Sequence, residues 1–247
     1  MEHDIRLALM TGIDIPVPEC QLTIHQPTIK EISMMGENDF NLGAHLVCID
    51  RKDYGLDKQP DLNNFNLLMK LLEDKEAADK KQTVKQFLLL ILPQCSRINI
   101  TSRSIFCNKD GENLILDEGN FESFQIALRK ILCMEHDKVK DKDDVPERYN
   151  PANDKARAIA DKIYAGRNAL AKLKAEKNPY DSMLSRKASI LAIGVGYTIE
   201  EINKFTIYQV NNLCTRMTMK MEKDMDDKIR LTGGKPDKSP PPWIGPI

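Results

Sequence analysis

A charged stretch, residues 135–153, does most to limit how this chain of 247 residues can fold. It mixes charges of both signs with two prolines, and only three of its side chains are substantially apolar: Val139, Val145 and Tyr149. Such a stretch cannot supply a buried face, so we interpret it as a linker or mobile loop. The sequence therefore predicts an N-terminal domain over 1–134, the linker over 135–153 and a helical C-terminal domain over 154–232.

The first 25 residues alternate between apolar and polar side chains, a period of two that is typical of β-strands. One face of a first strand would carry Ile5, Leu7 and Leu9, and Thr11-Gly12 would form the turn. A second strand would follow with Ile13, Ile15 and Val17, at a sheet edge because of its prolines. A third short strand over 21–25 completes the expected small sheet.

Helical patterns take over at Pro27, where Thr28 and Glu31 have the spacing of a capping box. We expect this helix to break at Gly36 and a second one to run over 39–48. Further along, the patterns predict four elements: a helix from Pro60-Asp61, a core helix over 83–92, a β-hairpin over 104–116 turning at Asp110-Gly111, and a helix over 121–132 capped by Asn120.

The C-terminal part is predicted to consist of helices followed by an extended tail. A helix is expected after Pro151, and another over 182–193, ended by Gly194 and Gly196. Two more capping signals, Thr198 with Glu201 and Thr206 with Gln209, open a short and a long helix. Gly233-Gly234 should stop the long helix, and the proline-rich residues 233–247 form an extended tail. The expected fold is α+β and predominantly helical: a small N-terminal β-sheet or hairpins packed with helices, then an all-α C-terminal part.

The net charge and the length of the apolar runs argue against several classes of function. The 36 Lys and Arg residues nearly balance the 37 Asp and Glu residues, so the net charge of −1 gives no global attraction to nucleic acid or anionic membranes. The longest apolar run, 87–92, is far shorter than the roughly 20 residues that span a bilayer. Six dispersed cysteines with no CxxC pair predict reduced, mostly buried thiols and a cytosolic chain.

No motif in the sequence indicates catalysis or a bound cofactor or metal. Gly194-Val195-Gly196 lacks the third glycine of a dinucleotide-binding turn, and in Gly233-Gly234-Lys235 the phosphate-loop Ser or Thr is replaced by Pro236. Cys133 and His136 lie three apart, but no second pair of metal ligands is visible. We therefore expect a protein that is not an enzyme and that has no catalytic, cofactor-binding or metal-binding residues.

The methionines near the end of the long helix allow two interpretations. Met217 and Met221 lie on the apolar stripe of that helix, with Met219 and Met225 nearby. Methionine fills irregular gaps in cores, but four of them so close together also suit a pliable binding surface. Trp243, the only tryptophan, would either anchor a partner or fold back onto the chain's own helices.

Four segments together resemble tail assembly proteins of long-tailed bacteriophages of Gram-positive hosts. They are IHQPTIKEISMMGENDF (24–40), NPANDKARAIADKIYAGRNALAKLK (150–174), ASILAIGVGYTIEEINKFTIYQVNNLCTRM (188–217), and the ending RLTGG with PPPWIGPI (230–247). The resemblance implies a tail assembly chaperone, which binds the tape measure protein and recruits tail tube protein around it. It also implies action in the host cell cytoplasm, absence from the mature virion, and no catalytic residues to carry over.

The sequence is thus expected to encode a non-enzymatic assembly factor with no nucleic-acid or membrane partner. The alternative is a structural tail or connector protein retained in the virion; an enzyme of unfamiliar design and a nucleic-acid binder rank lower. Self-association is left open. The residues predicted to bind a partner are Phe205, Tyr208, Met217, Met221 and Trp243.

Overall fold

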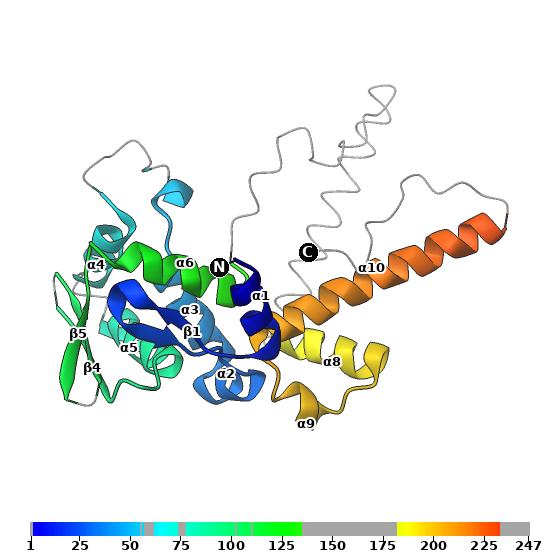
Figure 1. The fold of residues 1–247 in the computed structure, drawn as a ribbon, viewed down its shortest axis with the longest axis horizontal. Helices are drawn as coiled ribbons and strands as arrows, with labels where there is room; N and C mark the ends of the chain where they lie inside the picture. Colours follow the sequence, from blue (N-terminus) through cyan, green and yellow to red (C-terminus); the bar gives the residue numbers. More distant parts are fainter. Residues whose placement is uncertain are drawn as a thin grey trace, which may run out of the picture. The chain divides into compact units, whose positions relative to one another are not determined.

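The computed structural model describes residues 2–54, 56, 62–73, 78–101, 103–109, 111–134 and 182–232 (Figure 1). The fold is α+β, and 64% of the described residues are helical, which confirms the predicted class. Residues up to Met134 and those from Lys187 onward form one compact unit, and 135–186 form another. The predicted linker, the helix after Pro151 and the tail over 233–247 lie outside the described residues. The division into domains therefore stays a prediction.

The chain begins with a helix, α1 (Glu2–Thr11), and the strand predicted there is wrong. Ile5 and Leu9 are four residues apart, so they share a face of a helix as readily as a face of a strand. Leu9 is buried, whereas Leu7, which the strand interpretation placed beside it, is exposed. The segment between them consists of strong helix formers, and Gly12, with φ at +74°, ends the helix.

Two of the predicted short strands are present, and they pair antiparallel. They are β1 (Ile15–Val17) and β2 (Leu22–Ile24), joined by the 3₁₀ turn η1 (Pro18–Cys20). Pro16 faces Thr23 in this two-stranded sheet, where each strand has a free edge and a missing N–H is tolerated.

The predicted capping box begins α2 (Ile29–Met35), where Thr28 and Glu31 each bond the other's backbone N–H. Gly36, with φ at +96°, separates α2 from α3 (Glu37–Val47). After the 3₁₀ turn η2 (Arg51–Tyr54), α4 (Asn64–Glu73) begins later than predicted. Its first turn is capped by Asn63, whose Oδ1 accepts from the Asn66 N–H at 2.7 Å.

Helix α5 (Ala78–Ile91) is the central helix that the apolar run predicted. It packs against α3, where Gly43 lies under Phe87, and the rings of Phe40 and Phe87 meet edge-on at 5.4 Å. Four fully buried phenylalanines fill the core: Phe40, Phe87, Phe121 and Phe124.

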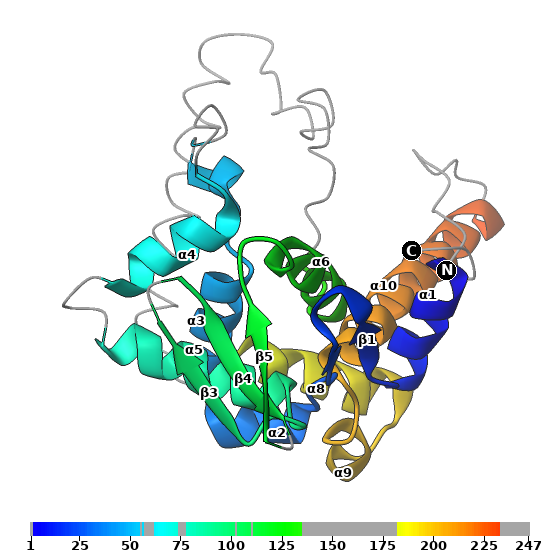
Figure 2. The same cartoon turned by 60° about the vertical axis from the view of Figure 1, so that its left-hand side comes forward.

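A three-stranded antiparallel sheet contains the predicted hairpin and one strand that was missed. Its order is β3 (Arg97–Ile100), β4 (Ile105–Lys109), β5 (Glu112–Leu116), and β3 lies against α5 (Figure 2). The strand β3 was not predicted. Helix α6 (Phe121–Ile131) follows, but Asn120 makes no side-chain cap. Its Oδ1 accepts from the Asp117 N–H instead, so the predicted cap is wrong.

The C-terminal helices are α8 (Met183–Val195), α9 (Ile199–Ile202) and α10 (Ile207–Leu231), and both predicted capping boxes are present. The Ile207 N–H donates to Pro27 O at 3.2 Å, and the Ile29 N–H donates to Phe205 O at 2.9 Å. The start of α10 therefore belongs to the same packed unit as the N-terminal residues. None of the helices among the described residues is long and apolar enough to cross a membrane.

Candidate partner-binding surface

The first turn of α10 is fixed in place by contacts with residues far away in the sequence. Thr28 and Thr206, which begin α2 and α10, form an isolated antiparallel bridge. Gln209 Nε2 donates to Met10 O at 2.9 Å, so α1 is tied to the same turn. These contacts give α10 a defined origin on the folded unit.

Helix α8 supports only the first part of α10. The Lys187 ammonium donates to Asn211 Oδ1, and a Cβ built on Gly194 would lie 2.5 Å from Met217 Sδ. The side chain of Met217 therefore occupies the space that Gly194 leaves open. Beyond this contact α8 ends, whereas α10 continues to Leu231 (Figure 1).

Two of the predicted partner-binding residues lie at the base of α10 and are partly buried. Phe205 stacks edge-on against Tyr197, with ring centroids 5.0 Å apart, and its carbonyl accepts from α2. Tyr208 lies in the first turn of α10. Since both side chains are only partly accessible, their contact with a partner stays a prediction.

The other three predicted residues differ in how exposed they are and in whether the structure describes them. Met217 is partly buried between α10 and α8, as expected of a packing residue. Met221, one turn further on, is 62% exposed. Trp243 lies outside the described residues.

Three strongly exposed apolar side chains at the turn between α8 and α9 were not predicted as binding residues. The exposed fractions are 88% for Ile193, 48% for Val195 and 55% for Ile199, and we call these three the α8–α9 apolar surface. Gly194 faces α10, so the side chains on either side of it point elsewhere. In the sequence, Gly194 could have indicated this surface. A glycine within a helix often marks a close contact with another helix, and the apolar residues on either side of it then face away from that contact.

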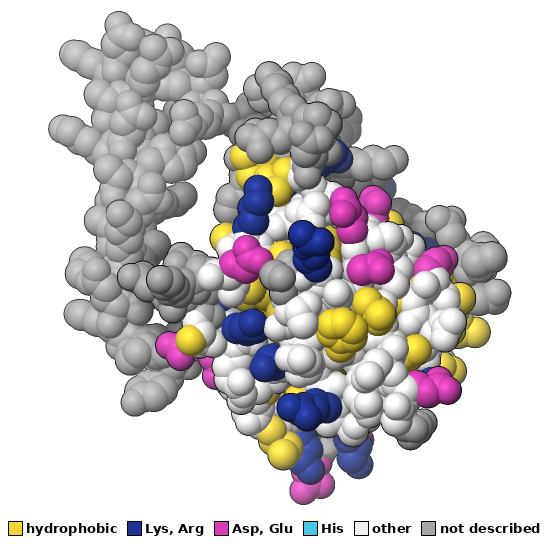
Figure 3. Space-filling view, turned by 90° about the vertical axis from the view of Figure 1, so that its left-hand side faces the viewer, with side chains coloured by type: hydrophobic (Ala, Val, Ile, Leu, Met, Phe, Trp, Pro, Cys, Tyr) yellow, Lys and Arg dark blue, Asp and Glu magenta, His cyan; other side chains and the backbone are white. Residues whose placement is uncertain are grey.

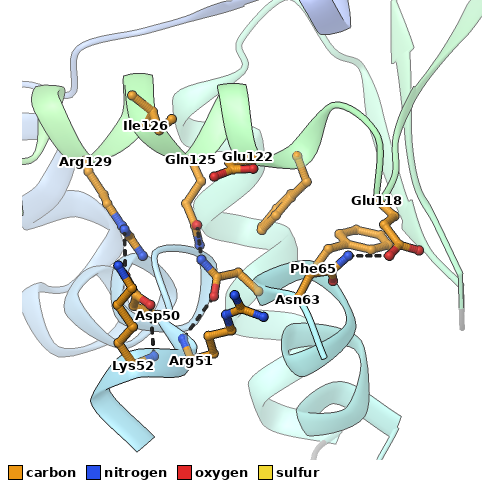
Figure 4. Close-up of a pocket in the computed structure, with 12 residues that line it drawn as sticks. Asp50, Arg51, Lys52, Asn63, Phe65, Glu118, Glu122, Gln125, Ile126 and Arg129 are labelled. Atoms are coloured by element: carbon orange, nitrogen blue, oxygen red, sulfur yellow. Dashed lines mark hydrogen bonds and ion pairs between the residues drawn. The ribbon is translucent and has the colours of Figure 1, made fainter. Parts of the chain in front are cut away.

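A polar cavity of about 380 Å³ lies between η2, α4 and α6 (Figure 4). Figure 4 shows Gln125 and Arg129 extending from α6 toward the chain that follows α3. Gln125 Nε2 donates to Val47 O and Ile49 O, both at 2.8 Å. Arg129 Nη2 donates to Cys48 O at 2.8 Å, and Nη1 pairs with Asp50 at 3.3 Å.

The polar side chains that line this cavity have a structural role that requires no ligand. The last carbonyls of a helix have no partner within the helix, and here α6 supplies their donors. Asn64 extends the same network, since its Nδ2 donates to Gln125 Oε1 at 2.9 Å and its Oδ1 accepts from the Arg51 N–H at 2.9 Å. We therefore assign these polar groups a role in joining α3, α4 and α6.

A shallow apolar groove of about 480 Å³ runs between α2 and α5. Met34, Met35, Leu89 and Leu90 line it, with Glu31 and Gln86 at its border. Its apolar side chains suit contact with a protein.

His25 connects two carboxylates near the start of α10. Its Nδ1 lies 2.9 Å from Asp14 Oδ1 and its Nε2 lies 3.2 Å from Glu31 Oε2. Burial opposes protonation of His25, but the hydrogen bonds to Glu31 and Asp14 outweigh it and raise its pKa. Burial likewise opposes ionisation of Glu31, but hydrogen bonds from Thr28 and His25 outweigh it and lower its pKa. The contact is therefore an ion pair at mildly acidic pH.

The face of the molecule drawn in Figure 3 carries hydrophobic, basic and acidic side chains side by side. Figure 3 shows small hydrophobic patches separated by Lys and Arg and by acidic side chains. A nucleic-acid interface would need positive charge gathered on one side, and this face mixes the two signs. The exposed apolar side chains of the α8–α9 turn and of α10 are candidate contacts for another protein.

No protein-family model, curated protein or solved structure matches the chain. Among the described residues, no group of three or more His, Cys, Asp or Glu side chains is placed to hold a metal ion.

Proposed function

We propose that this chain is a non-enzymatic tail assembly chaperone of a long-tailed bacteriophage. In this role it binds the tape measure protein, keeps it soluble, and promotes assembly of tail tube protein around it. The four segments that resemble such proteins support the proposal, and two of them, 24–40 and 188–217, make the contact at the start of α10.

One structural observation carries the proposal: large apolar side chains are concentrated and exposed on the C-terminal helices. Seven lie within residues 187–232: Ile190, Ile193, Val195, Ile199, Met221, Met225 and Leu231. Isolated exposed apolar residues are ordinary, but a concentration of them on the three helices α8, α9 and α10 is typical of a protein contact.

The α8–α9 apolar surface suits a helical partner with an apolar stripe. Ile193, Val195 and Ile199 lie within seven positions of one another and line no described cavity, so they suit a broad contact rather than a small ligand. A shallow aliphatic surface of this kind accepts different apolar sequences because it demands no particular hydrogen bonds. This tolerance is what a chaperone for a long, varied protein requires.

The proposal is tested by co-expressing the chain with the tape measure protein of its phage and measuring what co-purifies. We expect the wild type to co-purify and the double variant I193D/V195D to lose the partner, because aspartate places charge on the apolar contact. The matched control is Leu7→Asp, at an exposed apolar position in α1. Equal binding by the double variant and the wild type would contradict the proposed surface.

The alternative, a structural protein retained in the virion, predicts a different location. Mass spectrometry of purified particles separates the two, since a chaperone leaves the particle and a tail or connector protein stays in it. Presence of the chain in intact particles at the level of other tail proteins would favour the alternative.

A further inference from the structure

We propose that the C-terminal half of α10 binds the same half of a second copy of this chain, antiparallel, to form a symmetric dimer. The inference concerns a surface other than the α8–α9 apolar surface and does not depend on the proposed function. It gives Met221, predicted from the sequence to contact a partner, a contact with the chain's own copy.

The observation behind it is a helix that continues well past its support. After the Met217–Gly194 contact, α10 runs on from Thr218 to Leu231, about 21 Å at 1.5 Å per residue. Of the side chains described in this half, all are exposed except Met219 and Asp226, which are partly buried. A single helix of this length is only marginally stable in water, so packing on another surface would stabilise it.

The projecting half has an apolar stripe. Met217, Met221 and Met225 are each four residues apart, so they follow one another along one face of the helix. Met217 is the last to touch α8, and the exposed fractions are 62% for Met221 and 64% for Met225. The face that packs within the unit thus continues outward without a partner among the described residues.

The charges of this half fit a second copy of itself. Residues 218–231 carry four cations, Lys220, Lys223, Lys228 and Arg230, and four anions, Glu222, Asp224, Asp226 and Asp227. Among the described residues, no ion pair uses Lys220 or Asp227, and both side chains are exposed. On a helix of 3.6 residues per turn, these two lie along the same border of the methionine stripe.

An antiparallel arrangement brings these features together. In a two-fold contact, residue i of one copy meets residue j of the other and the reverse also holds. When Met221 of one copy lies opposite Met225 of the other, Lys220 comes beside Asp227, and the pair occurs twice. The methionines would form a pliable apolar seam, and the two ion pairs would fix its direction.

The proposal is tested by sedimentation equilibrium of the purified full chain over a wide range of concentration. We expect a monomer–dimer equilibrium, and Met225→Glu should weaken association by about tenfold or more, because it buries a charge in the seam. Leu7→Glu, at an exposed apolar position in α1, is the matched control and should leave association unchanged. Far-UV circular dichroism checks that each variant keeps its helical content.

Charge reversal tests the antiparallel pairing separately. Lys220→Asp and Asp227→Lys alone should each weaken the dimer by roughly fivefold, and the double variant should recover most of the loss because both ion pairs re-form reversed. A chain that stays monomeric at every concentration overturns the proposal. So does a dimer that Met225→Glu does not weaken, and a double variant without recovery overturns the antiparallel pairing. If the purified chain is monomeric but Met225→Glu loses the tape measure protein, that protein covers the stripe and the dimer is excluded.

Discussion

His25 ties together residues from three separate segments close to the origin of α10. Its ring contacts Asp14 and Glu31, and its backbone N–H donates to Ile91 O at 2.8 Å. The carboxylate of Glu31 also accepts from the Thr28 N–H at 2.8 Å and from its hydroxyl at 2.7 Å. One carboxylate thus serves both the histidine and the capping box of α2.

Replacement of His25 by glutamine should change how stability depends on pH. The pKa of His25 is raised from 6.5, so its contribution is complete below pH 6.5 and is lost as the pH rises through the folded-state pKa. The pKa of Glu31 is lowered from 4.5, so its contribution is present above pH 4.5 and is lost as the pH falls through its lower folded-state pKa. The wild type should therefore exceed His25→Gln in unfolding free energy most between these two values.

Urea denaturation across this range checks the expectation, with His45→Gln as the control. His45 is exposed in α3 and contacts neither carboxylate. A stability difference between wild type and His25→Gln that does not change with pH would contradict the ion pair.

Replacement of two helical glycines by alanine is expected to have different effects on the free energy of unfolding. A Cβ at Gly43 would lie 2.5 Å from Phe87 Cβ in the core, and overpacking of this kind costs about 1–3 kcal/mol. At Gly194 the added Cβ meets the flexible end of Met217, and alanine gains up to about 1 kcal/mol in helix propensity. Thermal or urea unfolding should show Gly43→Ala destabilised and Gly194→Ala nearly neutral. Equal losses in the two variants would mean that Met217 is held as firmly as Phe87.

Among the elements, the capping boxes are the features that the sequence predicts best. Thr28, Thr198 and Thr206 each accept from the backbone three residues on, and the partner side chain returns the bond. All participants lie within four positions, so local chemistry alone determines them. The hairpin of β4 and β5 was predictable for the same reason, since Gly111 takes a positive φ of 91° in its turn.

The elements that the sequence did not predict depend on distant partners or on an ambiguous period. The strand β3 is short, and its pairing with β4 and packing on α5 give it its structure. For α1, apolar residues at positions 5 and 9 fit either period, and the burial of Leu9 decides for the helix. The candidate site shows the same limit. Gly194 marks a close helix contact in the sequence, but its partner α10 is not identified by local patterns, and the exposure of Ile193 follows from that packing.

Removal of the Thr206 hydroxyl should loosen the origin of α10. Thr206 is almost fully buried, so Thr206→Ala should lose about 1–2 kcal/mol of unfolding free energy, at the upper end for an N-cap. Thr198→Ala, at an exposed cap, should lose less. Denaturation with hydrogen exchange at the first turn of α10 measures both, and Thr206→Ser should retain the wild-type behaviour. A larger loss at Thr198 than at Thr206 would refute the assigned role of the α10 cap.

The long helix α10 has two parts with different roles in the molecule. Its first half is integral to the folded unit, since Val210 is fully buried and Gln209 bonds Met10 across 199 positions. Its second half has few contacts with described residues and carries exposed methionines. Local patterns could not predict these contacts, because the residues that make them lie far apart in the sequence.

Truncation should separate the two halves. At a concentration where the full chain is monomeric, a chain ending at Met217 should unfold cooperatively with a midpoint close to that of the full chain, because the residues removed contribute little to the described core. A chain ending at Phe205 loses the first half of α10 and should be strongly destabilised. Thermal unfolding followed by circular dichroism compares them, and equal midpoints would contradict an integral role for the first half of α10.

The proposed function requires that this chain keep the tape measure protein soluble. The most direct measurement is the fraction of tape measure protein that stays in solution when it is expressed alone, with the wild type, or with the I193D/V195D variant. The proposed function predicts a large soluble fraction only with the wild type. A tape measure protein that is equally soluble, or equally insoluble, in all three cases would contradict it.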